Sequence, residues 1–226
     1  MAKILITSGP TRQYLDPIRY LTNASSGRMG AALACAALEC GYEPIVVSGP
    51  VEVEYPKGAD VRRVITTDDM REVAVRFFPE CVGAIGAAAP CDYRPFTVLE
   101  EKMTKDDFIR KPEQAGELLL RLRETPDVMA ALGEIKRDVS HPLGGQWLVA
   151  FALETSDHHV RALQKLQRKH CDLIVVNDPS AINVASSSVE ILNSQGESLA
   201  RLSGNKVETA RRLLYEIKKF VENKTL

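Results

Sequence analysis

The chain has 226 residues, of which 45% are hydrophobic and 26% charged, and its formal net charge is −1. This composition is typical of a globular protein with a substantial core, and it provides no global basic field for nucleic acid or for an anionic membrane. No apolar run approaches the ~20 residues of a membrane-spanning helix, and no signal peptide precedes the first predicted strand. We therefore expect a cytoplasmic protein with no nucleic-acid or membrane partner.

The cysteines and histidines give no pattern of metal ligands. Five cysteines are scattered along the chain without a Cys-x-x-Cys pair, and His158 and His159 are neighbours that would point about 100° apart on a helix. We expect reduced thiols, mostly buried in apolar surroundings, and no metal held by a protein cage.

The first half of the chain alternates between predicted strands and helices. Its apolar runs are unbroken, which is typical of strands buried on both faces of a parallel sheet. One helix is expected to begin with Thr67 as its N-cap and to carry Asp68 and Asp69 in its first turn. The predicted strands are 3–8, 44–48, 61–65 and 81–89, and the predicted helices are 27–40 and 67–78.

The second half continues this alternation after a charged stretch over 92–111. Thr125 resembles the N-cap of a helix that runs to Lys136, and Asn205 with Glu208 resembles the capping box of a final helix. The prediction is a single α/β domain over 1–226, with a Rossmann-like, doubly wound, mostly parallel sheet, a C-terminal antiparallel hairpin and a final helix. Strands are expected at 117–123, 147–151 and 172–176, a helix at 157–169, and a hairpin at 189–202.

The segment Asn23-Ala24-Ser25-Ser26-Gly27-Arg28-Met29-Gly30 lies where a long loop after the first strand turns into the first helix. The first turn of a helix has N–H groups without partners and a positive dipole end, so it attracts anions such as phosphate. Ser25 and Ser26 would add hydroxyl donors, and Gly27 would let a ligand approach the backbone. The alternative is an ordinary Ser/Asn helix cap with small residues that pack on a sheet.

Polar or glycine-rich segments follow four of the predicted strands, over 8–30, 87–94, 151–155 and 177–178. Ligands of doubly wound folds bind outside the carboxyl ends of the strands, so these segments are expected to form one small-molecule site.

Within and just beyond the charged stretch over 92–111, residues 97–113 carry Lys102, Lys105 and Lys111. Its residues predict either a mobile lid that closes over a substrate or a solvated linker.

A set of motifs occurs in one order along nearly the whole chain: Thr7-Ser8-Gly9-Pro10-Thr11-Arg12, Leu15-Asp16-Pro17-Ile18-Arg19-Tyr20, the Asn23–Gly30 segment, Ala88-Ala89-Pro90-Cys91-Asp92-Tyr93-Arg94, Glu101-Lys102, Phe151-Ala152-Leu153-Glu154-Thr155 and Asn177-Asp178. By these motifs and their order, the chain resembles the phosphopantothenoylcysteine synthetase family, the ligase half of a bifunctional flavoprotein of coenzyme A biosynthesis. The resemblance implies an enzyme that joins 4′-phosphopantothenate to cysteine. CTP or ATP would first convert the carboxylate into an acyl-nucleotide with release of pyrophosphate, and the cysteine amine would then displace the nucleotide.

The resemblance also implies roles for individual residues. Asn23 matches the asparagine that holds the acyl-nucleotide. Lys102 aligns with the first lysine of the family's mobile loop, although Lys111 could take its place after a loop shift. Asp92 is a candidate contact for Mg²⁺ that arrives with the nucleotide. Nucleotide or phosphate contacts are expected from Gly9, Ser25, Ser26, Gly27, Ala88, Ala89, Asp92, Lys105, Lys111 and Phe151.

Several charged residues keep two interpretations. Lys165 and Lys169 share one face of a predicted helix, where they either bind the triphosphate or form a solvated surface. Arg12 and Arg19 either pair with a phosphate or take part in surface or interface salt bridges. The loop over 15–20 resembles part of a two-fold interface, so we expect a homodimer.

Two other functions compete with the ligase. One is a non-catalytic or divergent nucleotide-binding paralogue. This hypothesis is kept because Met103 and Thr104 separate Lys102 from Lys105, whereas the family has a tighter lysine cluster. An NAD(P)-dependent oxidoreductase would need Gly-x-Gly-x-x-Gly in a short first turn and an acid at the end of the second strand, where the chain has Ser48-Gly49-Pro50. The chain starts directly at the ligase's first strand, without the flavin-dependent decarboxylase that often precedes it, so no FMN is expected.

Overall fold

The computed structural model describes residues 1–104, 119–138, 140–141, 144–153, 158–177 and 186–224. Its centre is one sheet made of β1 (Lys3–Ser8), β4 (Glu43–Ser48), β5 (Asp60–Arg63), β6 (Gly83–Gly86), β9 (Trp147–Leu153), β10 (Leu173–Asn177), β11 (Ser186–Asn193) and β12 (Ser198–Asn205). The strand order is β12-β11-β10-β9-β6-β1-β4-β5. All neighbours from β10 to β5 run parallel, and β11 and β12 continue the sheet as an antiparallel hairpin.

The central strands bury both of their faces, as their unbroken apolar sequences predict. In β1, Leu5 packs into the core on one face of the sheet, whereas Ile4 and Ile6 pack into the core on the other face. Successive side chains of a strand point to opposite faces, so a sheet with such strands needs helices on both sides.

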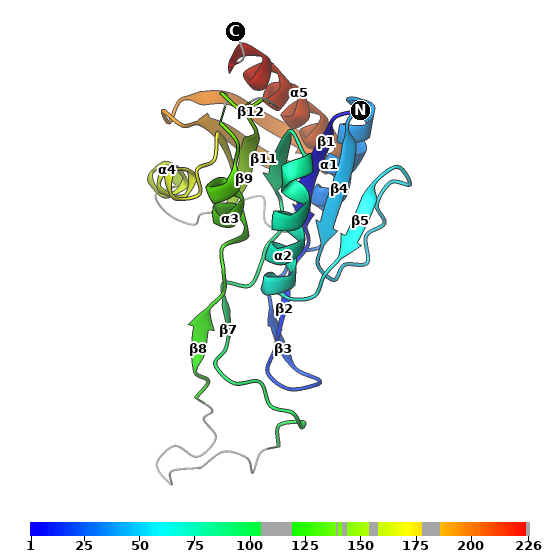
Figure 1. The fold of residues 1–226 in the computed structure, drawn as a ribbon, viewed down its shortest axis with the longest axis vertical. Helices are drawn as coiled ribbons and strands as arrows, with labels where there is room; N and C mark the ends of the chain where they lie inside the picture. Colours follow the sequence, from blue (N-terminus) through cyan, green and yellow to red (C-terminus); the bar gives the residue numbers. More distant parts are fainter. Residues whose placement is uncertain (105–118, 139, 142–143, 154–157, 178–185, 225–226) are drawn as a thin grey trace.

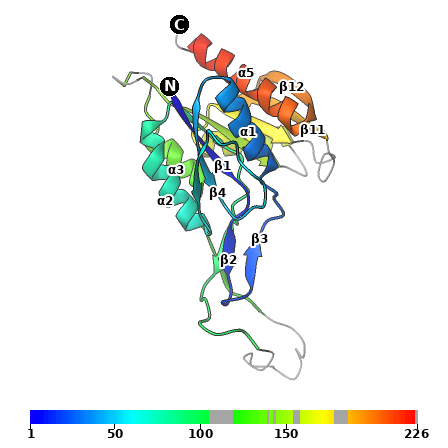
Figure 2. The same cartoon turned by 90° about the vertical axis from the view of Figure 1, so that its right-hand side faces the viewer.

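Helices cover the two faces of the sheet (Figures 1 and 2). The face of Ile4 is covered by α1 (Arg28–Glu39) and α5 (Lys206–Lys224). The face of Leu5 is covered by α2 (Thr67–Phe77), α3 (Val128–Ile135) and α4 (His158–Arg168), and the short 3₁₀ turn η1 (Phe78–Glu80) follows α2. The predicted Rossmann-like α/β fold with a C-terminal hairpin and a final helix is confirmed.

Local polar signals set several helix ends as predicted. Gly41, with φ 81°, follows the end of α1, where the left-handed conformation favours glycine. Asn205 Oδ1 accepts hydrogen bonds from the N–H groups of Val207 and Glu208, at 3.0 Å each, and so starts α5.

Two other predicted N-caps are wrong by one or two residues. Thr66, not Thr67, caps α2, because Thr66 Oγ1 accepts the N–H of Asp69 at 3.1 Å and Asp69 Oδ2 accepts the N–H of Thr66 at 2.9 Å. At α3 the cap is Asp127 instead of Thr125, and its carboxylate accepts a first-turn N–H at 3.1 Å.

Two short antiparallel ribbons project from the carboxyl edge of the sheet, and the sequence patterns predicted neither. The hairpin of β2 (Arg12–Tyr14) and β3 (Tyr20–Thr22) lies in the loop after β1. The second ribbon pairs β7 (Tyr93–Pro95) with β8 (Leu122–Glu124), so the strand predicted over 117–123 is shifted: residues 119–121 lie outside it. We call residues 11–22, 93–104 and 119–124 the arm (Figure 1).

Candidate functional site

The order of the sheet strands reverses between β1 and β6, so the segments after these two strands leave in opposite directions. Such a switch point opens a crevice at the carboxyl edge, which is where doubly wound folds bind ligands. After β1 the chain passes Gly9 and Pro10 and enters the arm, and after β6 it passes through residues 87–92. The small-molecule site predicted from the sequence therefore has the topology that it requires.

Asn23 ties these two segments together across the switch point. Its Nδ2 donates to the carbonyl oxygens of Pro90 at 2.9 Å and of Ala89 at 3.3 Å. Beside this contact, the N–H of Ala89 donates to the carbonyl of Gly9 at 2.9 Å, which extends the pairing of β1 and β6. The side chain of Asn23 is exposed, so its amide lies where a ligand in the crevice could reach it.

The first turn of α1 has no side-chain cap. Its N-cap is Gly27, with φ 73°, and an added Cβ there would lie 2.9 Å from Val51 Cγ1, so the turn requires glycine. The Ser/Asn cap of the alternative interpretation is therefore wrong, whereas its small residues, such as Ala34, do pack on the sheet. No side chain among the described residues accepts the first N–H groups of this turn, which leaves them for water or for an anion, and Ser25 and Ser26 line a cleft beside it.

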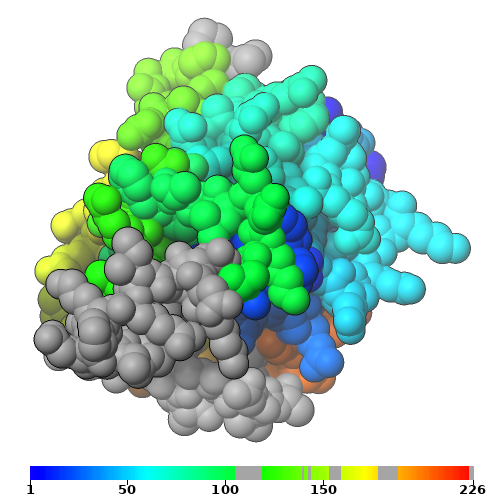
Figure 3. Space-filling view, turned by 90° about the horizontal axis from the view of Figure 1, so that it is seen from below, coloured from blue at the N-terminus to red at the C-terminus, as the bar shows by residue number. Residues whose placement is uncertain are grey.

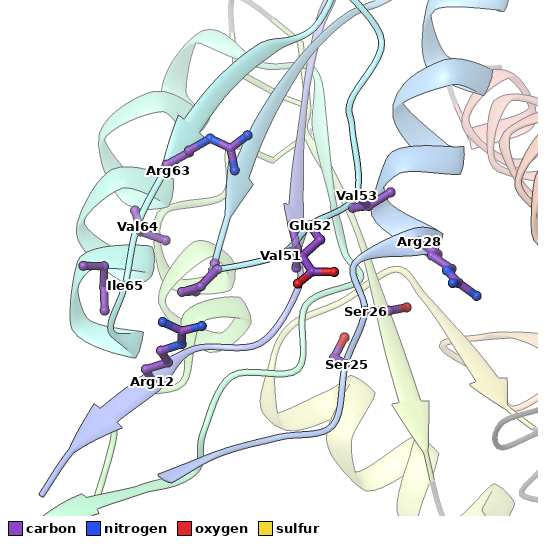
Figure 4. A pocket seen from close by; sticks show the side chains of 12 residues that line it. Arg12, Ser25, Ser26, Arg28, Val51, Glu52, Val53, Arg63, Val64 and Ile65 are labelled. Atoms are coloured by element: carbon purple, nitrogen blue, oxygen red, sulfur yellow. The ribbon is translucent and has the colours of Figure 1, made fainter. Parts of the chain in front are cut away.

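This cleft has a volume of about 900 Å³ and lies at the carboxyl ends of β4 and β5 (Figure 4). Three guanidinium groups line it, from Arg12, Arg28 and Arg63, whereas Glu52 is the one carboxylate in its lining. Among the residues that the structure describes, none of the three guanidinium groups forms an ion pair, and that of Arg12 lies over the ring of Tyr20, 4.5 Å from its centre. The excess of positive charge beside an open helix start suits a phosphorylated ligand.

Other candidate residues lie along the same edge of the sheet. Ala88 is half-buried, and its N–H lies 3.4 Å from Thr7 Oγ1. Asp92 is exposed, and its carboxylate has no hydrogen-bond partner within the described parts of the chain. Phe151, in the second half of β9, packs partly against the core on the α1 face.

The helical lysines lie elsewhere. Because α4 leaves the carboxyl edge after β9 and returns to the amino edge before β10, the backbone of Lys165, near the end of α4, and that of Lys169, just after it, lie toward the amino edge. Lys169 Nζ lies 3.1 Å from Asp127 Oδ2, which gives this lysine a structural partner. Lys105 and Lys111 lie outside the described residues.

Lys102 and Asn23 lie at opposite ends of the arm. The register of the β2–β3 hairpin places Asn23 just after its base and residues 15–19 at its tip. The N–H of Leu99 donates to the carbonyl of Leu15 at 2.9 Å, so the segment that carries Lys102 lies against the tip, as the contact of green and blue residues in Figure 3 shows. About four extended residues at ~3.3 Å each separate tip and base by roughly 13 Å, so the structure does not bring the two predicted catalytic residues together.

Two polar features of the arm were missed by sequence reasoning. At the base, Thr67 Oγ1 lies 2.8 Å from Thr11 Oγ1, accepts from Gln13 Nε2 at 3.0 Å and donates to the carbonyl of Cys91 at 3.1 Å. This buried network fixes the arm to α2. At the tip, Asp16 is fully buried. The pair Asp-Pro in a loop is a signal for a turn in which the carboxylate accepts nearby N–H groups, and it could have been used.

The burial of the cysteines agrees with the expectation that most of them are buried. All five are free, and Cys81, Cys91 and Cys171 are buried, whereas Cys40 is exposed. Burial raises the pKa of Cys81 and of Cys171 to about 12. In the described part of the chain, no three His, Cys, Asp or Glu side chains gather as metal ligands would, and no helix is both long and apolar enough to cross a membrane.

Several known proteins similar to this chain are named as coenzyme A biosynthesis proteins. The chain is 41% identical over 179 residues to the coenzyme A biosynthesis bifunctional protein CoaBC of Bacillus subtilis (strain 168), a match that covers 79% of this chain and 40% of the relative. It is 35% identical over 208 residues to the protein of the same name from Vibrio vulnificus (strain CMCP6), covering 90% of this chain and 49% of the relative. The chain thus spans less than half the length of these relatives.

A solved structure and a family model match nearly the whole chain. The crystal structure of the C-terminal domain of a coenzyme A biosynthesis bifunctional protein CoaBC has 32% sequence identity and a TM-score of 0.79, and the match covers 98% of this chain and 96% of that one. The model of the family described as DNA/pantothenate metabolism flavoprotein C-terminal domain matches residues 1–221. The chain therefore belongs to the family of DNA/pantothenate metabolism flavoprotein C-terminal domains, which confirms the resemblance seen in its motifs.

Proposed function

We propose that this chain is a ligase that joins 4′-phosphopantothenate to cysteine through an acyl-nucleotide, with CTP or ATP as the activating nucleotide. The observation that carries the proposal is the position of Asn23, whose amide bridges the segments after β1 and β6 at the switch point. The name of the two relatives described above, coenzyme A biosynthesis bifunctional protein, supports a reaction of the same pathway.

The proposed chemistry needs positioning more than a covalent nucleophile. A carboxylate oxygen of phosphopantothenate attacks the α-phosphorus, and the bond to pyrophosphate breaks. The cysteine nitrogen then attacks the acyl carbon, the bond to the nucleoside monophosphate breaks, and the amine loses a proton to solvent. Asn23 suits the second step, because a neutral amide can orient a mixed anhydride without attacking it.

We place the phosphates of the nucleotide at the start of α1, beside Gly9, Ser25, Ser26 and Gly27. The uncapped first turn and the cationic cleft support this placement. Ala88 and Ala89 would form the floor of the crevice, and Phe151 would lie beside the base.

Mg²⁺ would arrive with the nucleotide and keep most of its waters. The exposed carboxylate of Asp92 fits such a contact, because it is an oxygen ligand at the crevice without a protein partner in the described residues. The ion would neutralise charge on the phosphate oxygens. No flavin takes part in the proposal.

The lysine stretch would act by closing over the bound phosphates. Lys102 is the first candidate, and Lys105 and Lys111 are the others. The proposal does not depend on Lys165 and Lys169, whose assignment to the triphosphate stays a prediction that the ion pair of Lys169 does not support. The assignment of residues 1–226 to one domain and the cytoplasmic location also stay predictions.

The arm supports the proposal of a homodimer. Large apolar side chains gather there on the surface, including those of Ile18, Phe96, Val98 and Leu119, which are 52–92% exposed. Several large exposed apolar side chains within one projecting part of a molecule are typical of an interface. Light scattering at micromolar concentration should give the mass of two chains, and a monomer would contradict the proposal.

The ligase is tested by pyrophosphate release. The chain is incubated with phosphopantothenate and either CTP or ATP, with and without cysteine, and both pyrophosphate and the amide product are measured. A ligase releases pyrophosphate with at least one nucleotide and forms the amide only with cysteine. A non-catalytic paralogue would bind a nucleotide without releasing pyrophosphate, and an oxidoreductase would be stabilised by NAD(P) instead.

A further inference from the structure

Asp16 is a buried carboxylate whose two oxygens have different partners. Its Oδ1 accepts the N–H groups of Ile18 at 2.8 Å and of Arg19 at 2.7 Å, which closes the turn of the β2–β3 hairpin. Its Oδ2 accepts from Arg19 Nη1 at 2.8 Å and from the N–H of Met103 at 3.1 Å. One oxygen therefore serves the turn, whereas the other also reaches a segment 87 positions away in the sequence.

Met103 is fixed against the hairpin tip on three sides. Its N–H donates to Asp16, its carbonyl accepts Arg19 Nη1 at 2.8 Å, and its side chain is only 6% exposed. The N–H that Asp16 accepts belongs to the peptide bond between Lys102 and Met103. The carboxylate therefore fixes the backbone of Lys102, whose side chain is exposed and extends from this fixed point.

We propose that Asp16 is a positioning residue for Lys102, and that this contact makes Lys102 the lysine that acts in carboxylate activation. This inference rests on the proposed ligase function. Asp16 itself touches neither substrate nor nucleotide: it holds the peptide of Lys102 on the hairpin tip, so that the lysine moves with the arm when the arm closes over the phosphates. Arg19, which holds the carbonyl of Met103, supports the same peptide from the other side.

A carboxylate suits this position better than its amide. A buried charge is tolerated when several N–H groups donate to it, and Asp16 receives four such bonds on two oxygens. An asparagine at this position has one acceptor oxygen and an NH₂ group that would face N–H donors. It can therefore serve the turn or the N–H of Met103, but not both.

The test is a double-mutant cycle on the activation step. Pyrophosphate release is measured in a single turnover without cysteine, with phosphopantothenate and whichever of CTP or ATP supports the reaction, and the dissociation constant of the nucleotide is measured separately. We expect Asp16→Asn to slow activation by ~10- to 10²-fold, the scale of a misplaced catalytic group, and to change nucleotide binding less than about twofold. In the Lys102→Gln background, Asp16→Asn should have no further effect on the rate.

A matched control comes from an exposed ion pair. Asp60→Asn removes the contact of Asp60 Oδ2 with Arg62 Nη2, 2.7 Å in length, and should leave the activation rate unchanged. An unchanged rate in Asp16→Asn would overturn the proposal. It would also be overturned if the effects of Asp16→Asn and Lys102→Gln multiplied, or if Asp16→Asn lost its effect in a Lys111→Gln background instead.

A second pair of variants tests the proposal if Asp16→Asn fails to fold. Met103→Pro removes the N–H that Asp16 accepts and leaves the hairpin turn intact, whereas Met103→Ala keeps the N–H and removes the buried side chain. Activation should fall in Met103→Pro and stay near wild type in Met103→Ala. Equal loss in both variants, or loss in neither, would overturn the proposal.

Hydrogen exchange separates this inference from the proposed function. The Met103 amide of the wild-type chain should be protected, and the protection should be lost in Asp16→Asn but kept in Asp60→Asn. An active wild type with an unprotected Met103 amide would refute the positioning role alone. A wild type that releases no pyrophosphate although this amide is protected would refute the ligase, and with it the role assigned to the contact.

Discussion

The sheet and the arm of this chain are stabilised by opposite means. In the sheet, side chains such as Leu5 and Leu148 are fully buried, and helices cover both faces. In the arm, the buried side chains include polar ones, as in Gln13 and Asp16, besides that of Met103, whereas large apolar side chains such as Phe96 are exposed. The arm is therefore not a second small core: its shape depends on a few hydrogen bonds and, as we propose, on a second copy of the chain.

This difference bears on function because the proposed site lies where the two regions meet. The sheet sets the switch point and the start of α1, so the nucleotide end of the site rests on a rigid support. The arm carries Lys102, and its few buried apolar contacts predict a lower free energy of local opening. A rigid binding edge with a more mobile catalytic segment is what a ligase that closes over its substrates requires.

The largest expected effect tests the stability half of the comparison. Leu148→Ala should lower the free energy of unfolding by ~2–5 kcal/mol, because it leaves a cavity in the core of the sheet. Leu99→Ala in the arm removes the same atoms from a side chain that is 38% exposed, and we expect less than about 1 kcal/mol. Urea denaturation of both variants checks this, and equal losses would mean that the arm has a core of its own.

The next effect tests the junction of the two regions. Asn23→Ala removes the bridge to the carbonyls of Ala89 and Pro90 and the group that would orient the acyl-nucleotide. We expect ligation to cysteine to fall by ~10²-fold or more while pyrophosphate formation stays detectable, which is the scale of losing one well-placed donor. Both half-reactions are measured on the same variant. Equal and mild losses of both half-reactions would mean that Asn23 only connects two loops and does not orient the acyl-nucleotide.

The sheet could be predicted from the sequence because its signals are local. Runs such as Ile4-Leu5-Ile6 are apolar at every position, which indicates strands buried on both faces, and the helices between them start and end at recognisable residues. The errors are small and have a local cause. Thr66 and Thr67 are equally good caps by type, and the buried network at the base of the arm, which uses Thr67, is visible only in three dimensions.

The arm could not be predicted because its structure depends on contacts between distant segments. The strands of its hairpin have three residues each, too few for an alternating pattern, and the bond from Met103 to Asp16 crosses 87 positions. The candidate site likewise has a part that could be predicted from the sequence and a part that could not. The motif around Asn23 marked the switch point, whereas nothing in the sequence placed Lys102 at the far end of the hairpin.

A smaller effect separates the two neighbouring threonines at the start of α2. Thr66→Ala removes a helix cap and should lower the free energy of unfolding by ~1 kcal/mol without changing the arm. Thr67→Val keeps the shape and removes the hydroxyl that joins Thr11, Gln13 and Cys91, so it should loosen the arm. Limited proteolysis should therefore cut the arm faster in Thr67→Val than in Thr66→Ala. The opposite order would mean that the arm depends on the cap at Thr66 more than on the hydroxyl of Thr67.

The smallest effect is a dependence of stability on pH that belongs to the arm. Burial by itself would raise the pKa of Asp16, but the N–H groups of Arg19, Ile18 and Met103 and the guanidinium of Arg19 outweigh it, and the pKa falls from 3.8 to about 2. A carboxyl whose pKa is lower in the folded state contributes stability above its unfolded pKa. This contribution is lost as the pH falls toward the folded pKa.

The measurement is the melting temperature of the wild type minus that of Asp16→Asn. We expect this difference to be constant above about pH 5 and to shrink as the pH falls through 4 toward 2. Glu39→Gln is the matched variant outside the arm. Glu39 of α1 accepts hydrogen bonds from Arg211 of α5 on the exposed surface of these helices, and these bonds lower the pKa of Glu39. Its effect should be smaller, since water screens an exposed pair. A difference for Asp16→Asn that stays constant down to pH 2 would mean that the hairpin tip does not depend on the charge of Asp16, and the arm would then need another source of order.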